Sequence, residues 1–188
     1  MKKVMCGNEL DRMPGLAFRI MALIFRISDL VKSPRGRLDS FRIGKGQTLV
    51  DYGCGTGRYI RQASESVGEK GRVYAVDIHP LAIKAAAGIS AKFNLKNVSP
   101  LLTDGKSVDI PTASADLVYA LDMFHMVSDT GSFLKELYRI TKPDGILILE
   151  DGHQPRALAK EKVSRSGCWE VAEETRSHMK YKPKKQVP

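Results

Sequence analysis

From residue 46 onward, short apolar runs alternate with longer amphipathic stretches. The apolar runs predict strands at QTLVDYG (47–53), GRVYAVDIH (71–79), VSPLLTDG (98–105), ADLVYALDMF (115–124) and GILILEDG (145–152), the last after a turn at KPDG (142–145). The stretches between them predict helices at GTGRYIRQASESVG (55–68, opening on a glycine turn), PLAIKAAAGISAKFNL (80–95) and SFLKELYRIT (132–141). Strands that alternate with helices of this length indicate an α/β fold with a doubly wound parallel sheet.

The C-terminal quarter breaks this alternation. PRALAKEKVSRSG (155–167) predicts a helix, and CWEVAEET (168–175) and HMKYKPKK (178–185) each have the alternation of a strand. A short polar break separates the two strands. We therefore expect them to close the sheet as a terminal hairpin with one antiparallel edge.

The segment PGLAFRIMALIFRISDLVK (14–32) predicts a helix that is apolar at nearly every position up to Val31. Arg19 and Arg26 are seven residues apart and share one face, with Asp29 three residues further on. Such a wide apolar surface needs more cover than the edge of a small domain supplies. Three uses stay open: a lid over a substrate, a dimer contact or core packing, and a membrane or partner surface.

The length of 188 residues fits one structural domain, which we divide into a helical cap (1–40) and a main domain (41–188). The net charge of +9 comes from the ends: residues 1–45 hold ten Lys and Arg against four acids, and residues 173–188 hold five against two. Proteins that bind nucleic acid usually carry their positive charge on a folded face beside aromatic residues. Because the charge of this chain lies at its ends, we do not expect a nucleic-acid partner. The chain has no long apolar span or signal peptide, so we expect a cytoplasmic protein.

The stretch LVDYGCGTGRY (49–59) is a glycine-rich turn after an apolar strand. A dinucleotide loop would have GxGxxG, yet here Arg58 stands where the third glycine belongs, and no Walker motif is present. Asp51 at the strand end would repel a pyrophosphate and would attract an ammonium or sulfonium group. The bare backbone of the turn allows a ligand to lie directly against it.

Two further acids follow the next predicted strands. Asp77 ends the second strand, where it can bind the hydroxyls of a ribose, and Asp104 follows the third, where it can accept from an adenine amino group. Taken together with Asp51, these residues predict an adenosine ligand with a cationic tail.

The motifs VDYGCGTGRY, VYAVDIHP, LLTDG, ADLVYALDMFHMV and LKELYRITKPDGILILED resemble those of class I S-adenosylmethionine-dependent methyltransferases, in the small branch that includes the quinone-biosynthesis enzymes. The resemblance covers residues 40–188. It implies a Rossmann-like, mostly parallel seven-stranded sheet with a terminal antiparallel hairpin. It also implies S-adenosylmethionine as cofactor, S-adenosylhomocysteine as product, and direct methyl transfer.

The same resemblance assigns cofactor-binding roles. The residues around the methionine part would be Asp51, Gly53, Cys54, Gly55 and Gly57. Asp77 would hold the ribose with Ile78 beside the adenine, Asp104 and Gly105 would meet the adenine edge, and Leu121 would face the reacting methyl.

Displacement from a sulfonium requires alignment more than a fixed catalytic residue. The candidates for a base follow the fourth and fifth strands: His153 is the first choice, then His125 and Asp122, with Glu150 and Asp151 nearby. Their spacing matches no metal-ligand pattern, so no metal is predicted.

The acceptor is expected to be a small, lipophilic molecule. A non-catalytic, cofactor-binding subunit and an RNA methyltransferase remain as alternatives, although the fourth strand lacks the [DN]PP[YFW] motif of enzymes that methylate base amino groups.

Overall fold

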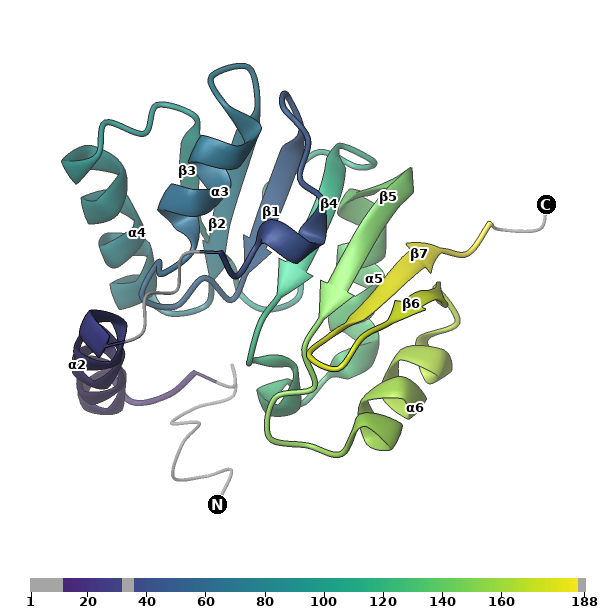
Figure 1. The fold of residues 1–188 in the computed structure, drawn as a ribbon. Helices are drawn as coiled ribbons and strands as arrows, with labels where there is room; N and C mark the ends of the chain where they lie inside the picture. Colours follow the sequence, from purple (N-terminus) through teal and green to yellow (C-terminus); the bar gives the residue numbers. More distant parts are fainter. Residues whose placement is uncertain (1–11, 32–35, 186–188) are drawn as a thin grey trace.

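A seven-stranded sheet forms the centre of the fold (Figure 1), in a computed structural model that describes residues 12–31 and 36–185. The strand order is β3-β2-β1-β4-β5-β7-β6. The strands are β1 (Thr48–Tyr52), β2 (Arg72–Asp77), β3 (Val98–Leu102), β4 (Ala115–Ala120), β5 (Thr141–Leu149), β6 (Trp169–Glu174) and β7 (Met179–Pro183). Strands β1 to β5 pair in parallel, and β7 pairs antiparallel with both β5 and β6. The predicted fold class, including its terminal hairpin, is confirmed.

Helices cover both faces of the sheet (Figure 1). They are α2 (Gly15–Val31), α3 (Ile60–Val67), α4 (Pro80–Lys92), α5 (Thr130–Ile140) and α6 (Arg156–Ser166), with short 3-10 turns η1 (Asp39–Phe41) and η2 (Phe124–Met126). Buried residues of α5 and α6 pack on one face of the sheet, and those of α3 and η1 pack on the other. Because side chains alternate along a strand, neighbours such as Leu49 and Val50 in β1 enter opposite halves of the core.

The beginning of β5 differs from the prediction. Residues 142–145, expected as a turn, belong to the strand, which begins directly after α5 and pairs with β4 through a register shift. The Lys142 ammonium donates to Asp116 Oδ1 at 2.5 Å. A Cβ on Gly145 would lie only 2.7 Å from Thr141 Cγ2. The missing side chain and the ion pair allow Lys-Pro-Asp-Gly to run along the strand instead of turning.

The strand order reverses between β1 and β4, since β2 and β3 lie on one side of this pair and β5 on the other. In an open parallel sheet, the loops on the two sides of such a reversal diverge and leave a crevice at the carboxyl ends of the strands. All candidate residues from the first four predicted strands therefore come to one edge.

Helix α2 lies outside the two helical layers, beside α4 and at this same edge (Figure 1). It packs inward through Phe18, Met21 and Ala22, in a cluster that includes Ala82 and Leu81 of α4. In the described parts of the chain, no helix combines the length and apolar character needed to cross a membrane. The first eleven residues of the predicted cap lie outside the described residues.

Candidate functional site

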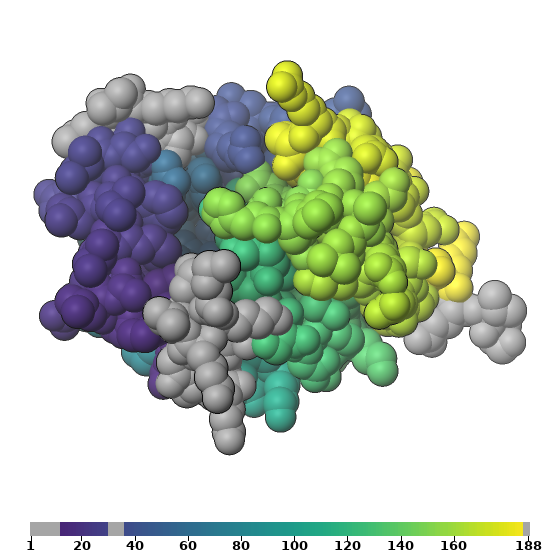
Figure 2. All heavy atoms as spheres, turned by 90° about the horizontal axis from the view of Figure 1, so that it is seen from below, coloured from purple at the N-terminus to yellow at the C-terminus, as the bar shows by residue number. Residues whose placement is uncertain are grey.

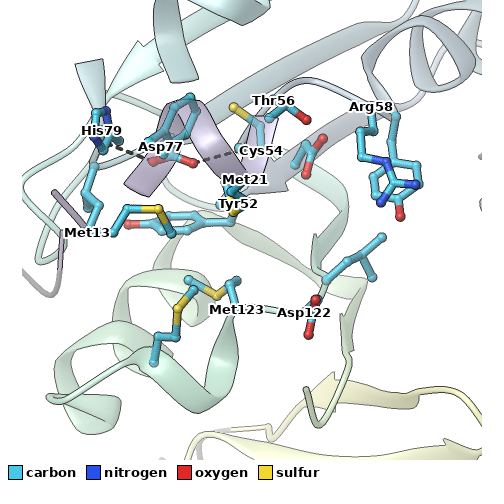
Figure 3. Close-up of a pocket in the computed structure, with 18 of the residues that line it drawn as sticks. Met13, Met21, Tyr52, Cys54, Thr56, Arg58, Asp77, His79, Asp122 and Met123 are labelled. Atoms are coloured by element: carbon cyan, nitrogen blue, oxygen red, sulfur yellow. Dashed lines mark hydrogen bonds between the residues drawn. The ribbon is translucent and has the colours of Figure 1, made fainter. Parts of the chain in front are cut away.

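A cavity of about 400 Å³ lies at the carboxyl ends of β1, β2 and β4. Its size is within the range of roughly 300–1,000 Å³ that is typical of small-molecule sites. The glycine loop after β1 and the loops after β2 and β4 form one side, and residues from α2 form the other. In Figure 3, Asp77 and Cys54 lie in the upper part of this space, with Met123 and Asp122 below them.

The glycine loop has the conformation that its sequence predicts. Gly53, Gly55 and Gly57 have φ values of 83°, 52° and 79°, a region that strongly favours glycine. The Gly53 and Cys54 N–H groups both donate to the Val76 carbonyl, at 2.7 and 2.9 Å, and so hold the turn against β2. A Cβ on Gly53 would lie 2.8 Å from Met123 Cγ, so a side chain there would collide with the loop after β4.

Gly57 has a different role from its two neighbours. It does not line the cavity, whereas Gly53, Cys54 and Gly55 do. A Cβ on Gly57 would lie 2.7 Å from Ile89 Cδ1 and 3.1 Å from Ile60 Cδ1. Gly57 therefore allows α3 and α4 to approach each other closely behind the loop.

Asp51 is a buried carboxylate without full compensation. It is 2% exposed and lines the cavity, and its Oδ2 has no hydrogen-bond partner among the described residues. Burial, reinforced by the charge of Asp77, raises the pKa of Asp51 to about 8, and the nearby Tyr119 hydroxyl offsets only part of this rise. A cation placed in the cavity would restore the ionised form.

Asp77 holds the loop and also faces the cavity. Its Oδ2 accepts from the Gly55 N–H and its Oδ1 from the His79 N–H, each at 2.8 Å (Figure 3). Burial raises the pKa of Asp77, and these two N–H donors act in the opposite direction. Each carboxylate oxygen keeps further acceptor capacity, so the side chain can still receive two hydroxyl donors.

The next predicted residues divide into two groups. Ile78, Gly105 and Leu121 line the cavity, but Asp104 does not. Asp104 is exposed, and its Oδ1 accepts from the Lys106 and Ser107 N–H groups at 2.8 and 2.9 Å. These bonds lower the pKa of Asp104, and they show that its side chain stabilises the turn that begins at Asp104. The structure does not bring its side chain to the other site residues.

The opposite wall is made of residues that sequence reasoning did not single out. Phe18, Met21 and Phe25 reach the cavity from α2, and Met126 and Phe133 reach it from η2 and α5. The only available signal was the excess apolar surface of the N-terminal helix. Apolar side chains in a helix look alike whether they enter a core or line a cavity, so their positions could not be assigned.

An ion pair joins α2 to the glycine loop. The Arg58 Nε donates to Asp29 Oδ2 at 3.1 Å, and its Nη2 contacts Asp29 Oδ1. The Arg58 guanidinium also lies 4.6 Å from the centre of the Phe25 ring. Asp29 therefore faces the loop, and the arginine at the third-glycine position of the dinucleotide pattern fastens the helix.

A second ion pair crosses the cavity rim. The Arg37 guanidinium contacts the Glu150 carboxylate, and both residues line the cavity. Asp151, the neighbouring acid, instead binds Arg156 Nε at 2.7 Å and stabilises the start of α6.

The three catalytic candidates, Asp122, His125 and His153, lie near one another, and only Asp122 lines the cavity. Asp122 has a φ of 53°, unusual for a residue other than glycine. His153 Nε2 lies 3.9 Å from Asp122 Oδ1, and its ring centroid is 5.0 Å from that of His125. Neither histidine lines the cavity, and the His153 side chain is 82% exposed. Burial lowers the pKa of His125, which favours the neutral imidazole.

Within residues 12–31 and 36–185, no group of three or more His, Cys, Asp or Glu side chains is arranged to hold a metal ion. Of the predicted site residues, nine line the cavity: Asp51, Gly53, Cys54, Gly55, Asp77, Ile78, Gly105, Leu121 and Asp122. Gly57, Asp104 and the two histidines lie outside its lining.

Comparison with known proteins matches residues 43–186 to a family described as a methyltransferase domain. Nocamycin O-methyltransferase of Saccharothrix syringae is 33% identical over 60% of this chain and 40% of its own length. Demethylmenaquinone methyltransferase of Geobacillus stearothermophilus is 30% identical over 60% of this chain and 48% of its own length. The chain thus spans less than half of the length of these two relatives.

Among solved structures, a SAM-dependent methyltransferase from Aquifex aeolicus superposes with a TM-score of 0.70 and 27% identity, covering 80% of this chain and 88% of that one. The resemblance inferred from the motifs is therefore confirmed, and so is the Rossmann-like methyltransferase fold.

Proposed function

The chain belongs to the methyltransferase domain family, and on that premise we propose that it binds S-adenosylmethionine in the cavity and transfers its methyl group to a small, lipophilic acceptor. The observation that carries this proposal is the buried Asp51 carboxylate, whose Oδ2 has no partner and whose pKa is raised to about 8. Burial disfavours the ionised form of this carboxyl, and a cationic ligand beside it would restore that form. S-adenosylmethionine has both an ammonium and a sulfonium.

The residues present fit this cofactor. Gly53 and Gly55 leave the loop without side chains, so the methionine part can lie against the backbone near Asp51. Asp77 would accept the two ribose hydroxyls, and Ile78 and Gly105 would flank the adenine ring. Asp104 retains its proposed contact with the adenine amino group only if its turn opens toward the cavity.

The acceptor would lie between the β4 loop and α2. The side chains from α2 that reach this space are Phe18, Met21 and Phe25, all apolar. Burying an apolar acceptor against them provides roughly 25 cal/mol per Å² of apolar surface removed from water. In this proposal the segment through residue 40 is the cap, and residues 41–188 form the cofactor-binding domain.

When bound, the cofactor would supply an electrophilic methyl group: the acceptor's nucleophile would bond to the methyl carbon while the carbon–sulfur bond breaks and S-adenosylhomocysteine leaves as a neutral thioether. The role of this chain would be to align the nucleophile and to exclude water. The inner side of α2 and Met123 in the β4 loop line opposite walls of the cavity and would do this together. Leu121 and Asp122, at the end of β4, face the position where the methyl would be transferred.

Where the acceptor carries a proton to lose, Asp122 is the candidate group at the cavity itself. His153, 3.9 Å from Asp122, would take that proton and pass it to solvent, and His125 would orient the His153 ring. An acceptor that is already ionised would need none of the three.

Calorimetric titration tests the cofactor proposal. We expect S-adenosylmethionine and S-adenosylhomocysteine to bind and NAD not to bind, because a pyrophosphate would lie beside Asp51 and Asp77. If neither adenosyl ligand binds, the assignments of Asp51 and Asp77 fail together.

Transfer itself needs a second assay. Methyl-labelled S-adenosylmethionine is incubated with the protein and a panel of hydroquinones, phenols and carboxylic acids, and with RNA as the competing class. Label that moves to an organic-phase product supports the proposed acceptor class, and label in RNA contradicts it. Cofactor binding without transfer to any compound would favour a non-catalytic subunit.

A further inference from the structure

We propose that the outer face of α2 docks on an anionic lipid bilayer surface. This inference concerns a surface outside the cavity, so it goes beyond the proposed function and does not depend on it. The outer face is defined by five apolar side chains with two arginines at their edge: Leu16, Ile20, Leu23, Ile24, Ile27, Arg19 and Arg26.

The two sides of α2 differ in what covers them. Phe18 is 5% exposed, and with Met21 and Phe25 it faces the cavity. On the opposite side Leu16 is 72% exposed and Leu23 is 59% exposed. Five of the nine large hydrophobic residues that are exposed in the described chain lie in this one helix. The lid function explains the inner side only, and the outer apolar face needs a second partner.

Figure 2 shows how accessible the helix is. Seen from below, the purple atoms of α2 form a ridge at one side of the molecule. A ridge can enter the boundary between headgroups and acyl chains without the rest of the protein following. The five apolar residues run from Leu16 to Ile27, about three turns of the 17-residue helix, so they form one continuous face over that length.

The charges beside this face match an anionic surface. Arg19 and Arg26 are exposed, and neither has an ion-pair partner among the described residues. The single acid of α2, Asp29, is turned inward and bound to Arg58. Residues 1–45 carry ten Lys and Arg against four acids, whereas the central part of the chain is balanced. Long arginine side chains at the edge of an apolar face can bury their stems and leave the charge among headgroups.

The size and charge of the face argue against a second copy of this chain as its occupant. A 17-residue helix is about 25 Å long and about 10 Å across, which is small beside the ~800 Å² that each partner buries in a standard interface. A symmetric pairing of this face would also bring Arg19 and Arg26 toward the same residues of the partner. A bilayer requires no matched surface and supplies the opposite charge.

The test is vesicle flotation of the full chain with two liposome compositions, phosphatidylcholine alone and equal parts of phosphatidylcholine and phosphatidylglycerol. We expect the chain to float with the mixed vesicles and to bind phosphatidylcholine on the order of tenfold more weakly. The variant Ile20→Gln/Ile24→Gln should lower the partition coefficient about tenfold or more on both. Arg19→Gln/Arg26→Gln should lower it about tenfold on the anionic vesicles only.

Matched controls separate the face from general surface effects. Lys70→Gln/Lys96→Gln removes the same charge from exposed positions in the loops before β2 and β3, and Leu158→Gln removes an exposed apolar side chain from α6. Both should float as the wild type does. Circular dichroism and S-adenosylhomocysteine titration check that each variant is folded, so a failure of the docking and a failure of the proposed function give different results.

Three outcomes would overturn the proposal. The first is a wild-type chain that stays with the unbound fraction on the anionic vesicles. The second is binding that the control variants weaken as much as the α2 variants do. The third is a dimer in sedimentation velocity that Ile20→Gln/Ile24→Gln dissociates, with no vesicle binding, which would assign the face to a second copy.

Discussion

The two sides of the cavity are built by different means. On the strand side, consecutive residues form one turn, and backbone N–H groups and carboxylates fix its shape: Gly55 binds Asp77, and Gly53 binds Val76. On the α2 side, apolar side chains from a separate helix come into place by packing, and one ion pair fastens them. The strand side contains buried carboxylates and a hydrogen-bonded backbone turn, whereas the side chains that α2 contributes to the cavity are apolar.

This difference separates two tasks. A loop held by hydrogen bonds to buried carboxylates can recognise one ligand in one orientation, since each lost partner leaves a buried polar group unpaired. A wall of methionine and phenylalanine can adapt to acceptors of varied shape because it offers no directional contacts. We therefore expect substitutions on the strand side to act on the cofactor and substitutions on the helix side to act on the acceptor.

The largest expected effect is that of Asp77→Ala on cofactor affinity. The change removes the ribose acceptor and also the partner of the Gly55 and His79 N–H groups. Lost hydrogen bonds to a carboxylate are worth about 1.5–3 kcal/mol each, so the dissociation constant should rise at least about a hundredfold in calorimetric titration. Asp104→Ala is the matched control, with a change of about threefold or less. If Asp104→Ala weakens cofactor binding as much as Asp77→Ala does, Asp104 also contacts the cofactor.

Asp51→Asn should have the next largest effect on cofactor affinity, and it should also change how stability depends on pH. Because the folded pKa of Asp51 is about 8 and its usual value is 3.8, the wild type should lose stability relative to the variant as pH rises between these values. The unfolded chain releases the proton first, so the difference grows by up to about 1.4 kcal/mol per pH unit. Urea unfolding of both proteins across this pH range measures it.

The same variant bears on cofactor recognition. Saturating S-adenosylmethionine should reduce the pH-dependent difference, since a bound cation lowers the pKa of Asp51, and the variant should bind it roughly tenfold more weakly. Identical pH profiles for the two proteins would refute the raised pKa.

On the helix side, Met21→Ala should act on the acceptor. With the first acceptor found by the labelling screen, we expect KM to rise up to about tenfold, because Met21 is partly buried and full burial of such a side chain is worth about 1.5–3 kcal/mol. The affinity for S-adenosylhomocysteine should change little. Ile27→Ala, on the outward side of the same helix, should leave both values unchanged. If Met21→Ala weakens cofactor binding by the same factor by which it raises the acceptor KM, the two sides of the cavity do not have the separate roles proposed here.

The smallest effect is expected where the two sides meet. Asp29→Asn weakens the ion pair between Asp29 and Arg58, whose side chains are 25% and 22% exposed, respectively. We therefore expect the free energy of unfolding to fall by about 1 kcal/mol or less and cofactor binding to become a few-fold weaker. Glu65→Gln breaks the pair with Arg61, which is exposed and lies on α3, and should have no measurable effect on binding. Titration at low and high salt checks both, since added salt should reduce the difference.

The same contrast explains what could be predicted from the sequence. The turn at residues 53–57 was predictable because its glycines report a backbone conformation, and Asp51 and Asp77 because strand ends converge in a parallel sheet. Asp104 occupies an equivalent place in sequence, yet its side chain satisfies its own turn. Whether an aspartate faces a cavity or its own backbone depends on local geometry that residue type does not fix.

The unpredicted features depend on contacts between distant segments. Arg37 meets Glu150 across more than a hundred residues, and Lys142 meets Asp116 where a turn was expected in β5. The inner and outer sides of α2 have similar composition, so their separation into a cavity wall and an exposed face follows only from where the helix packs.

The attachment of α2 to Arg58 has a further consequence, through thermodynamic linkage. Arg58 follows the glycine turn that would hold the cofactor, and Asp29 and Phe25 belong to the helix. The Arg58 guanidinium therefore connects the turn with α2. Coupling free energies are reciprocal: if ligand binding in the turn favours the fastened helix, then whatever holds the helix in place must strengthen ligand binding by the same factor. A ligand in the cavity would then favour the attached position of α2, and attachment of α2 would raise the affinity for that ligand.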